Sequence, residues 1–473
     1  MIERFLVPLL FAMPSPTPPA DAPCVRPTRA GTQVQGDVRV CPGKYRLPDP
    51  TERGVIIAAA SGTRIDLSGV TLESGDSVPA VFTGIGVTSR GVDGVTVLGG
   101  IVRGYRFGIR LEGGRGHRVS GVDVSGSRRQ RLVSTADKAD SADRLDLSHQ
   151  KIFDSYGGGV WLQGTVGATV TGVTARDAQN GIGLADSRDG YIADNYVSGN
   201  SGWAISLWHS SHNTITRNQA GRTVRCGRAG ECGAAAILVR EGSDSNTFTD
   251  NDLTASSIGA LVTAAAPLTR PSVGNLFNRN DASRAMDAGF AVRLTWATIF
   301  LENRADSSGN GFLLFRAAGQ TIRGNTVIGS RGAAIAASGG ADNAIEENVL
   351  LGGRTGVEVR AADATAPASR GYHIDDNVIG NVGQGIVLQG VARSRIRGNV
   401  IDRVDVAVVI DSTGHATEIA GNVFLRASGT YIVAPDLAAG GNYWATADAQ
   451  TAAARVRGRV SVLPWKPASS AGY

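Results

Sequence analysis

Asparagine recurs along this chain in a nearly fixed register, which constrains the fold more than any other feature. Asn195 and Asn218 are 218 − 195 = 23 residues apart, and each follows an isoleucine by three positions. The same pairing of isoleucine or phenylalanine with asparagine is found at Ile192–Asn195, Ile215–Asn218, Phe248–Asn251, Phe277–Asn280, Phe300–Asn303, Ile322–Asn325, Ile345–Asn348, Ile374–Asn377, Ile396–Asn399 and Ile419–Asn422. A repeat of this period is typical of stacked solenoid architectures.

A short stretch of alternating apolar residues precedes the asparagine in each unit, as in Ile182 and Leu184 or Ile205 and Leu207. The stretch recurs at Ile109/Leu111, Val160/Leu162, Ile237/Val239, Phe290/Val292, Phe312/Leu314, Val357/Val359 and Ile386/Leu388. Alternation with a period of two residues indicates β-strands rather than helices. We call this strand the first strand of its coil, and the sheet that these strands form the first-strand sheet.

Short apolar runs separated by glycine, serine, aspartate and asparagine predict triangular coils of parallel strands. Coils stack at a strand spacing of about 4.8 Å, so a column of asparagines can form a hydrogen-bonded amide ladder. A leucine-rich repeat has a similar period, but its asparagine follows the strand leucine closely, whereas Asn195 follows Leu184 by 195 − 184 = 11 residues. The sequence therefore predicts an all-β chain, a single right-handed parallel β-helix of about 14 coils with terminal caps.

The predicted coils occupy residues 65–440, between an N-terminal cap at 23–64 and a C-terminal cap and tail at 441–473. Caps are expected because a bare terminal coil would expose a sheet edge. A weak helical stretch is expected at Asp448–Val456, within the C-terminal cap.

The predicted register is interrupted by insertions at 127–157, 221–234, 263–274 and 361–373. The first insertion is highly charged and lacks alternation. The first two insertions both enter the stack just before a first strand. We therefore expect them to emerge at the same corner of the helix.

The first 22 residues have the features of an export signal: Arg4, an apolar stretch at Phe5–Met13, and the small-x-small sequence Ala20-Asp21-Ala22. The apolar stretch is too short to cross a bilayer, and no other window approaches the necessary length. We expect a secreted or periplasmic protein without a membrane span. The net charge is only +5 and the arginines are scattered, which argues against a nucleic-acid partner. The sequence leaves the oligomeric state open.

Four cysteines agree with an oxidising compartment. Cys24 and Cys41 flank the first ordered segment, and Cys226 and Cys232 flank a loop in the second insertion. Local pairing would close each loop with a disulfide. The alternative, a metal site, is disfavoured by the scattered histidines and the lack of a C-x-x-C motif. We therefore expect two disulfides, no metal site and no cofactor, with a bound calcium ion kept as an alternative.

The repeat pattern, GIxLxxSxxNxIxxN, resembles the parallel β-helix repeats (PbH1 repeats) of the carbohydrate-binding protein and sugar hydrolase superfamily. That superfamily includes pectate-lyase-like enzymes, mannuronan C5-epimerases and NosD-like periplasmic proteins, and the resemblance covers about residues 66–465. The stretches Asn200–Asn218, Ser127–Arg131 and Ala235–Phe248 are similar to exported β-helix proteins of unassigned activity. The resemblance implies a pectin-lyase-like fold but says little about function. The sequence has neither an epimerase-like Asp-Pro-His-Asp motif nor the methionine- or histidine-rich tracts that copper handling would favour.

Titratable residues fall at equivalent positions just past the first strands of successive coils. Asp186, His209 and Glu241 form one predicted column, and His212 lies three residues beyond His209. Residues in register on adjacent coils are about 4.8 Å apart, and neighbouring carboxylates would favour a charged imidazole suited to acid–base chemistry. Tyr156, at the end of the first insertion, is a further candidate acid.

Residues that alternation directs outward from the first strands form a candidate binding surface. They are Trp161, Gln163, Trp208, Arg240 and Arg293, joined by Arg129 from the first insertion. Aromatic rings stack on sugar faces and arginines bind carboxylates. The surface therefore suits an acidic polysaccharide.

The first hypothesis of function is an exported enzyme that binds and processes an acidic polysaccharide, as a lyase or C5-epimerase. Such chemistry needs a cation for the uronate carboxylate, a base for the C5 proton and an acid on the other side. We assign Arg240 to the carboxylate and His209 to the base. Tyr156 or His212 would be the acid.

The alternative hypothesis is a noncatalytic carbohydrate-binding or scaffold module that uses the same surface. A glycoside hydrolase with two carboxylates, such as Asp186 and Glu241, is a weaker alternative. A purely structural interpretation is also available, because aspartate and histidine are ordinary turn residues. In that interpretation Trp208 packs against the Cys226–Cys232 loop.

Overall fold

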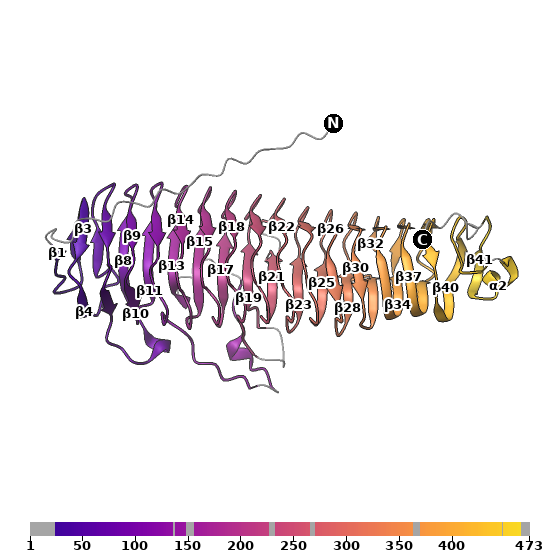
Figure 1. The fold of residues 1–473 in the computed structure, drawn as a ribbon, viewed down its shortest axis with the longest axis horizontal. Coiled ribbons are helices and arrows are strands. Elements are labelled where there is room, and N and C mark those ends of the chain that lie inside the picture. Colours follow the sequence, from indigo (N-terminus) through magenta and orange to yellow (C-terminus); the bar gives the residue numbers. More distant parts are fainter. Residues whose placement is uncertain are drawn as a thin grey trace.

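The computed structural model describes residues 24–135, 138–147, 156–226, 232–264, 270–362, 369–446 and 448–464. Within them the chain forms one elongated right-handed parallel β-helix, which Figure 1 shows as a row of stacked coils. The predicted fold class is confirmed. The predicted signal peptide at 1–22 lies outside the described residues.

One face of the helix is a sheet of sixteen strands. In spatial order they are β1 (Cys24–Val25), β3 (Asp37–Val40), β6 (Arg64–Asp66), β9 (Thr96–Leu98), β12 (Arg118–Ser120), β14 (Thr169–Thr171), β16 (Tyr191–Ala193), β18 (Thr214–Thr216), β20 (Thr247–Thr249), β22 (Leu276–Asn278), β24 (Ile299–Leu301), β26 (Thr321–Arg323), β29 (Ala344–Glu346), β33 (His373–Asp375), β36 (Arg395–Arg397) and β38 (Glu418–Ala420). The predicted number of coils is not confirmed, since this sheet alone has sixteen strands.

The first-strand sheet is the second long face, and its neighbouring strands also pair in parallel. Its strands are β2 (Thr32–Val34), β5 (Ile56–Ala58), β8 (Ile85–Arg90), β11 (Phe107–Glu112), β13 (Gly158–Gln163), β15 (Asn180–Ala185), β17 (Trp203–Trp208), β19 (Ala235–Arg240), β21 (Ile258–Thr263), β23 (Ala288–Arg293), β25 (Asn310–Phe315), β28 (Ala333–Ser338), β31 (Thr355–Arg360), β34 (Val378–Gln389), β37 (Val400–Ile410), β40 (Ala427–Ala438) and β41 (Val456–Ser461).

The third face has shorter strands, because single bridges replace the sheet over several coils. Its strands are β4 (Gly43–Arg46), β7 (Val70–Glu73), β10 (Ile101–Arg103), β27 (Thr326–Ile328), β30 (Val349–Leu351) and β39 (Val423–Phe424). A further pair, β32 (Ser369–Arg370) and β35 (Val391–Ala392), forms a small separate sheet. Near the C-terminus, Asp448 caps helix α2 (Ala449–Ala453) by accepting from the backbone of Gln450 and Thr451, within the stretch expected to be helical.

The N-terminal segment differs from the expected cap. Strand β1 pairs in parallel with β3, β3 with β6, and β2 with β5, so regular stacking begins well before residue 65. Several of these strands are polar, as in Asp37–Val40, and none of them has a ladder asparagine. The repeat pattern therefore did not predict them. The predicted disulfide between Cys24 and Cys41 is confirmed here.

The predicted asparagine ladder is confirmed from Asn195 to the C-terminal end of the stack. Each side-chain amide nitrogen donates to the amide oxygen of the asparagine on the next coil at 2.9–3.0 Å. The ladder runs through Asn195, Asn218, Asn251, Asn280, Asn303, Asn325, Asn348, Asn377, Asn399, Asn422 and Asn442. A second, shorter ladder through Asn213, Asn246 and Asn275 was not predicted.

Stacked phenylalanines fill part of the interior between the three faces. The rings of Phe248 and Phe277 lie 4.4 Å apart and nearly parallel, and Phe300 continues the column at 5.2 Å from Phe277. The core that contains them is continuous from Val34 to Val462. The stack is thus a stiff support for whatever lies on its outer faces.

Candidate functional site

The first insertion lies across the outer face of the first-strand sheet. We call its described residues, 127–135, 138–147 and 156, the strap, which Figure 1 shows alongside the coils. The backbone nitrogen of Leu145 donates to the carbonyl oxygen of Cys232 at 2.9 Å. The first two insertions are therefore in contact, in agreement with the prediction that they emerge at the same corner of the helix. Leu145 also belongs to a hydrophobic cluster with Leu238 and Leu261 that lies outside the coil interior.

Arg225, at the start of the second insertion, fastens the strap to the coils. Its side chain is buried, and its Nη2 donates to Oε1 of Gln130 at 2.7 Å. Its Nη1 donates to the carbonyl oxygen of Ser201 at 3.0 Å, and its Nε donates to the carbonyl oxygen of Asp143. Burial lowers the pKa of Arg225. One buried cation therefore joins two points of the strap to the solenoid, close to the confirmed Cys226–Cys232 disulfide.

The outward tryptophans are covered, contrary to the prediction that they offer a sugar-stacking surface. Trp161 is 2% exposed and Trp208 is 5% exposed, and both belong to the cluster beneath the strap. The ring of Trp161 lies directly over Gly183, where the Cβ of any larger residue would come within 2.1 Å of the ring. Alternation correctly placed these rings on the outer face, but the strap removes that part of the face from solvent.

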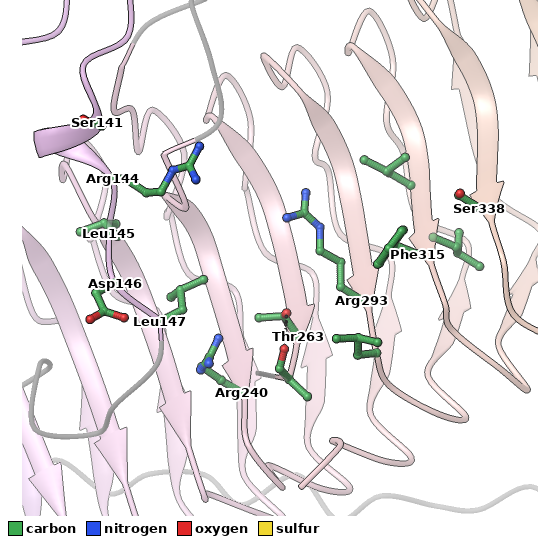
Figure 2. A pocket seen from close by; sticks show the side chains of 14 residues that line it. Ser141, Arg144, Leu145, Asp146, Leu147, Arg240, Thr263, Arg293, Phe315 and Ser338 are labelled. Carbon is green, nitrogen blue, oxygen red and sulfur yellow. Dashed lines mark hydrogen bonds between the residues drawn. The ribbon is translucent and has the colours of Figure 1, made fainter. Parts of the chain in front are cut away.

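Past the end of the strap the outer face opens into a groove of about 910 Å³ (Figure 2). The groove is lined by Ser141, Arg144, Leu145, Asp146, Leu147, Arg240, Thr263, Ala264, Arg293, Leu294, Leu313, Leu314, Phe315 and Ser338. Among the predicted binding residues, Arg240 and Arg293 lie here, and Arg144 of the strap faces the same space. Asp146 is the one carboxylate among these lining residues.

The prediction that the first insertion lacks alternation is wrong at its strap residues 144–147, and the sequence therefore did not predict that they line the groove. In fact Arg144, Leu145, Asp146 and Leu147 alternate between charged and apolar side chains. Such alternation is typical of an extended segment with one apolar face. It was the available signal that this part of the insertion packs on a sheet.

Arg240 gives the groove a buried positive charge. It is 2% exposed, its Nη2 lies 3.2 Å from Oε1 of Glu241, and its guanidinium stacks on the ring of Trp208 at 5.3 Å. Its Nε has no hydrogen-bond partner among the described residues. Burial lowers the pKa of Arg240 to about 10, so it remains charged at neutral pH. A buried, incompletely hydrogen-bonded cation is a favourable partner for an anion.

The predicted column of titratable residues exists, but its members differ in environment. Nδ1 of His209 lies 3.4 Å from Oδ1 of Asp186, and both side chains are more than 40% exposed. The backbone of His209 donates to the carbonyl oxygen of Glu241. The Glu241 side chain, however, is 2% exposed and ion-paired with Arg240. Its carboxylate is therefore held in that ion pair and is shielded from a ligand at the surface. His209 and His212 both have positive φ angles, as turn residues do.

Tyr156 does not converge with His209. Its ring packs edge-on against Trp203 at 5.8 Å, and its hydroxyl accepts from the backbone nitrogen of Asp146 at 3.0 Å. Burial raises the pKa of Tyr156. Trp203 begins β17 and His209 follows the end of that strand, so their backbones are about 20 Å apart at 3.3 Å per residue. An acid and a base so placed cannot act on one sugar ring.

The other two predicted binding residues lie outside the groove lining. Gln163 accepts a hydrogen bond from Nη2 of Arg110 at 2.9 Å, on β13. The backbone nitrogen of Arg129 donates to the carbonyl oxygen of Pro79 at 3.1 Å. Both residues are half-buried.

The described part of the chain contains no group of three or more histidine, cysteine, aspartate or glutamate side chains that could ligate a metal ion. Both cysteine pairs are disulfides. In the same described residues, no helix is long and apolar enough to cross a membrane.

Solved structures similar to this chain have diverse functions. A family 28 exopolygalacturonase from Yersinia enterocolitica is 13% identical, with a TM-score of 0.43 over 77% of this chain and 74% of its own. The A-module of the mannuronan C-5 epimerase AlgE6 from Azotobacter vinelandii is 14% identical, with a TM-score of 0.41 over 83% and 91%. PfbA, a surface adhesin of Streptococcus pneumoniae, is 12% identical, with a TM-score of 0.42 over 84% and 85%. These TM-scores are below 0.5, so none of the likenesses assigns a function.

No curated protein matches the chain in sequence. One family model does match, in two overlapping segments at residues 85–298 and 268–455. It describes NosD, a periplasmic copper-binding protein. Together the two segments cover most of the stacked coils, and the chain therefore belongs to the NosD family.

Proposed function

We propose that this chain is an extracytoplasmic, noncatalytic protein that binds an acidic polysaccharide in the groove beside the end of the strap. The observation that carries the proposal is the charge of the groove. Arg144, Arg240 and Arg293 line it, against the lining carboxylate of Asp146 and the carboxylate of Glu241, which is ion-paired with Arg240. Arginine binds carboxylates through paired hydrogen bonds, and Arg240 does so from a largely desolvated position where such bonds are strong.

The spacing of the arginines supports a polymer rather than a small anion. Arg240 is in register with Thr263 on the next strand, and Thr263 with Arg293. The two arginines are therefore about 9.6 Å apart along the helix axis, twice the strand spacing. That is a separation on the scale of a disaccharide, so alternate uronate carboxylates of an extended chain could each meet one arginine.

The arrangement favours binding over elimination or epimerisation. His209, the assigned base, follows the end of β17, whereas Tyr156, one of the two assigned acids, packs against Trp203 at the start of that strand. Neither of these residues lines the groove, and His212, the other assigned acid, does not line it either. Glu241 is held in an ion pair with Arg240, which also disfavours the two-carboxylate hydrolase. These contacts do not assemble an acid–base pair around the arginines.

An extracytoplasmic location is supported by both disulfides and by the periplasmic description of the family. Copper binding is not part of the proposal. The described residues offer no cluster of ligating side chains, and disulfide-bonded cysteines are not available as thiolate ligands.

Isothermal titration of the purified chain with size-defined oligouronates and with neutral glucans of equal length tests the proposal. We expect binding of the acidic series only. Arg293→Gln should weaken it by about 10- to 100-fold, the value of a charged hydrogen bond. The matched control is Arg426→Gln, an exposed arginine on a distant coil, which should bind as the unaltered chain does. Equal binding of neutral glucans, or unchanged binding by Arg293→Gln, would refute the groove assignment. Appearance of unsaturated uronate absorbance during the titration would show a lyase instead.

A further inference from the structure

The groove is not uniformly polar: one part of its surface is aliphatic and aromatic. An outward row on the first-strand sheet runs through Leu238, Leu261, Ala291 and Leu313 in register. The first three are at most 1% exposed, in the cluster beneath the strap. Leu313 is half-buried and lines the groove. The covered hydrophobic row therefore emerges from beneath the strap directly into the groove.

The apolar surface lies beside a binding arginine. Phe315 is in register with Arg293 on the adjacent strand, about 4.8 Å away. Phe315 is 37% exposed, and Leu313 lies two residues before it on the same face of β25. A carboxylate bound by Arg293 would thus hold the rest of its sugar ring against Leu313 and Phe315.

An unsubstituted sugar can match that surface only with its apolar C–H face. Its ring hydroxyls would lose water against a leucine and a phenylalanine, and a hydroxyl buried without a partner is costly. Hydroxyl groups lie at the edges of this wall and not on it: Thr263 donates to the carbonyl oxygen of Ala264 at 3.3 Å, and Ser338 is in register with Phe315 on the next strand. A short acyl group in place of the hydroxyl hydrogen would remove the donor and bury methyl surface instead.

We infer that the groove selects acidic saccharides whose ring hydroxyls carry short acyl esters, such as O-acetyl groups, with the acyl group against Leu313 and Phe315. This inference rests on the proposed function and specifies its ligand. Carboxylate recognition belongs to the arginines, and acyl recognition belongs to the apolar wall. The two contributions should therefore be separable by substitution.

The experiment compares one O-acetylated bacterial polyuronate with the same polymer after mild alkaline removal of its esters. We expect the acetylated form to bind about four-fold tighter for each methyl group buried. Leu313→Ser and Phe315→Ser should each reduce that preference. Arg293→Gln should weaken both polymers equally. Phe315 is the more exposed of the two, so its variant retains a folded chain if Leu313→Ser does not, as circular dichroism would verify.

Each outcome separates the inference from the proposed function. Equal affinity for both polymers overturns the acyl preference and leaves acidic polysaccharide binding in place. A preference that survives in both serine variants overturns the assigned position of the acyl group. Binding of neither polymer removes the proposed function, and the inference with it.

Discussion

Replacing Arg225 by alanine should release the strap and leave the coils folded. The change removes donors to Gln130, Ser201 and Asp143, and each charged hydrogen bond is worth about 1.5–3 kcal/mol. The variant also avoids the cost of burying a guanidinium, which is several kcal/mol. We expect a net loss of about 2–4 kcal/mol in the free energy that holds the strap closed. In a solenoid, stability adds up coil by coil, so the loss should stay local.

Amide hydrogen exchange measures that local free energy. The reporters are the backbone amides of Leu145, which donates to Cys232, and of Val133, which donates to the carboxylate of Asp143. A loss of 2–4 kcal/mol should speed their exchange by about 30- to 700-fold. Arg222→Ala is the matched control, because Arg222 is an exposed arginine three residues earlier. Unchanged exchange in Arg225→Ala, or equal acceleration in the control, would refute the fastening role.

Asn303→Ala should destabilise the chain by about 3–6 kcal/mol, because it leaves the ladder neighbours on both sides with unsatisfied buried groups. Chemical denaturation would measure the loss, and the control Asn278→Ala, at a half-buried outward position of β22, should cost no more than about 1 kcal/mol. The strap should also loosen in acid. Burial would raise the pKa of Asp143, but hydrogen bonds from Ser134 and Val133 outweigh it and hold the pKa below its usual value. Its stabilising contribution is therefore complete above about pH 3.9 and is lost as the pH falls through the lower, folded-state value. Exchange of the strap amides against pH should show this loss, and Asp143→Asn should abolish the dependence.

The fold was predictable because its main determinants are periodic. A column of asparagines requires asparagine to recur at a nearly regular spacing in the sequence, and the alternation of apolar residues such as Ile205 and Leu207 indicates the strands. The N-terminal coils were not recognised, because strands such as Asp37–Val40 are polar and have no ladder asparagine. The second ladder, through Asn213, was missed for a related reason. After Asn275 the equivalent positions on the next coils hold other residues, such as Gln320, so asparagine does not recur at a regular spacing.

The candidate site was only partly predictable, because the alternation of residues along a strand predicts on which face a side chain lies but not whether that face is exposed to solvent. Alternation placed Trp161 and Arg240 correctly on the outer face. Whether either meets solvent depends on where the first insertion lies, and that is decided by long-range contacts such as Arg225 with Gln130, 95 residues apart in sequence. The structural interpretation of Trp208 as a packing residue was therefore nearer the truth than its role in sugar stacking. Of the predicted binding residues, Arg240 and Arg293 are the two that lie together in the lining of the groove.

The groove and the strap are thermodynamically linked, because Arg144, Leu145 and Leu147 form one wall of the groove. A ligand that needs this wall binds only the closed strap, so it must stabilise closure by RT ln(1 + [L]/Kd), about 2.7 kcal/mol at one hundred times Kd. We therefore expect an oligouronate at that concentration to slow exchange of the Leu145 amide about 100-fold. The same protection should be found in Arg225→Ala, starting from a faster rate. A ligand that binds with full affinity yet leaves the Leu145 amide unprotected cannot lie in this groove, and that result would move the binding site elsewhere on the helix.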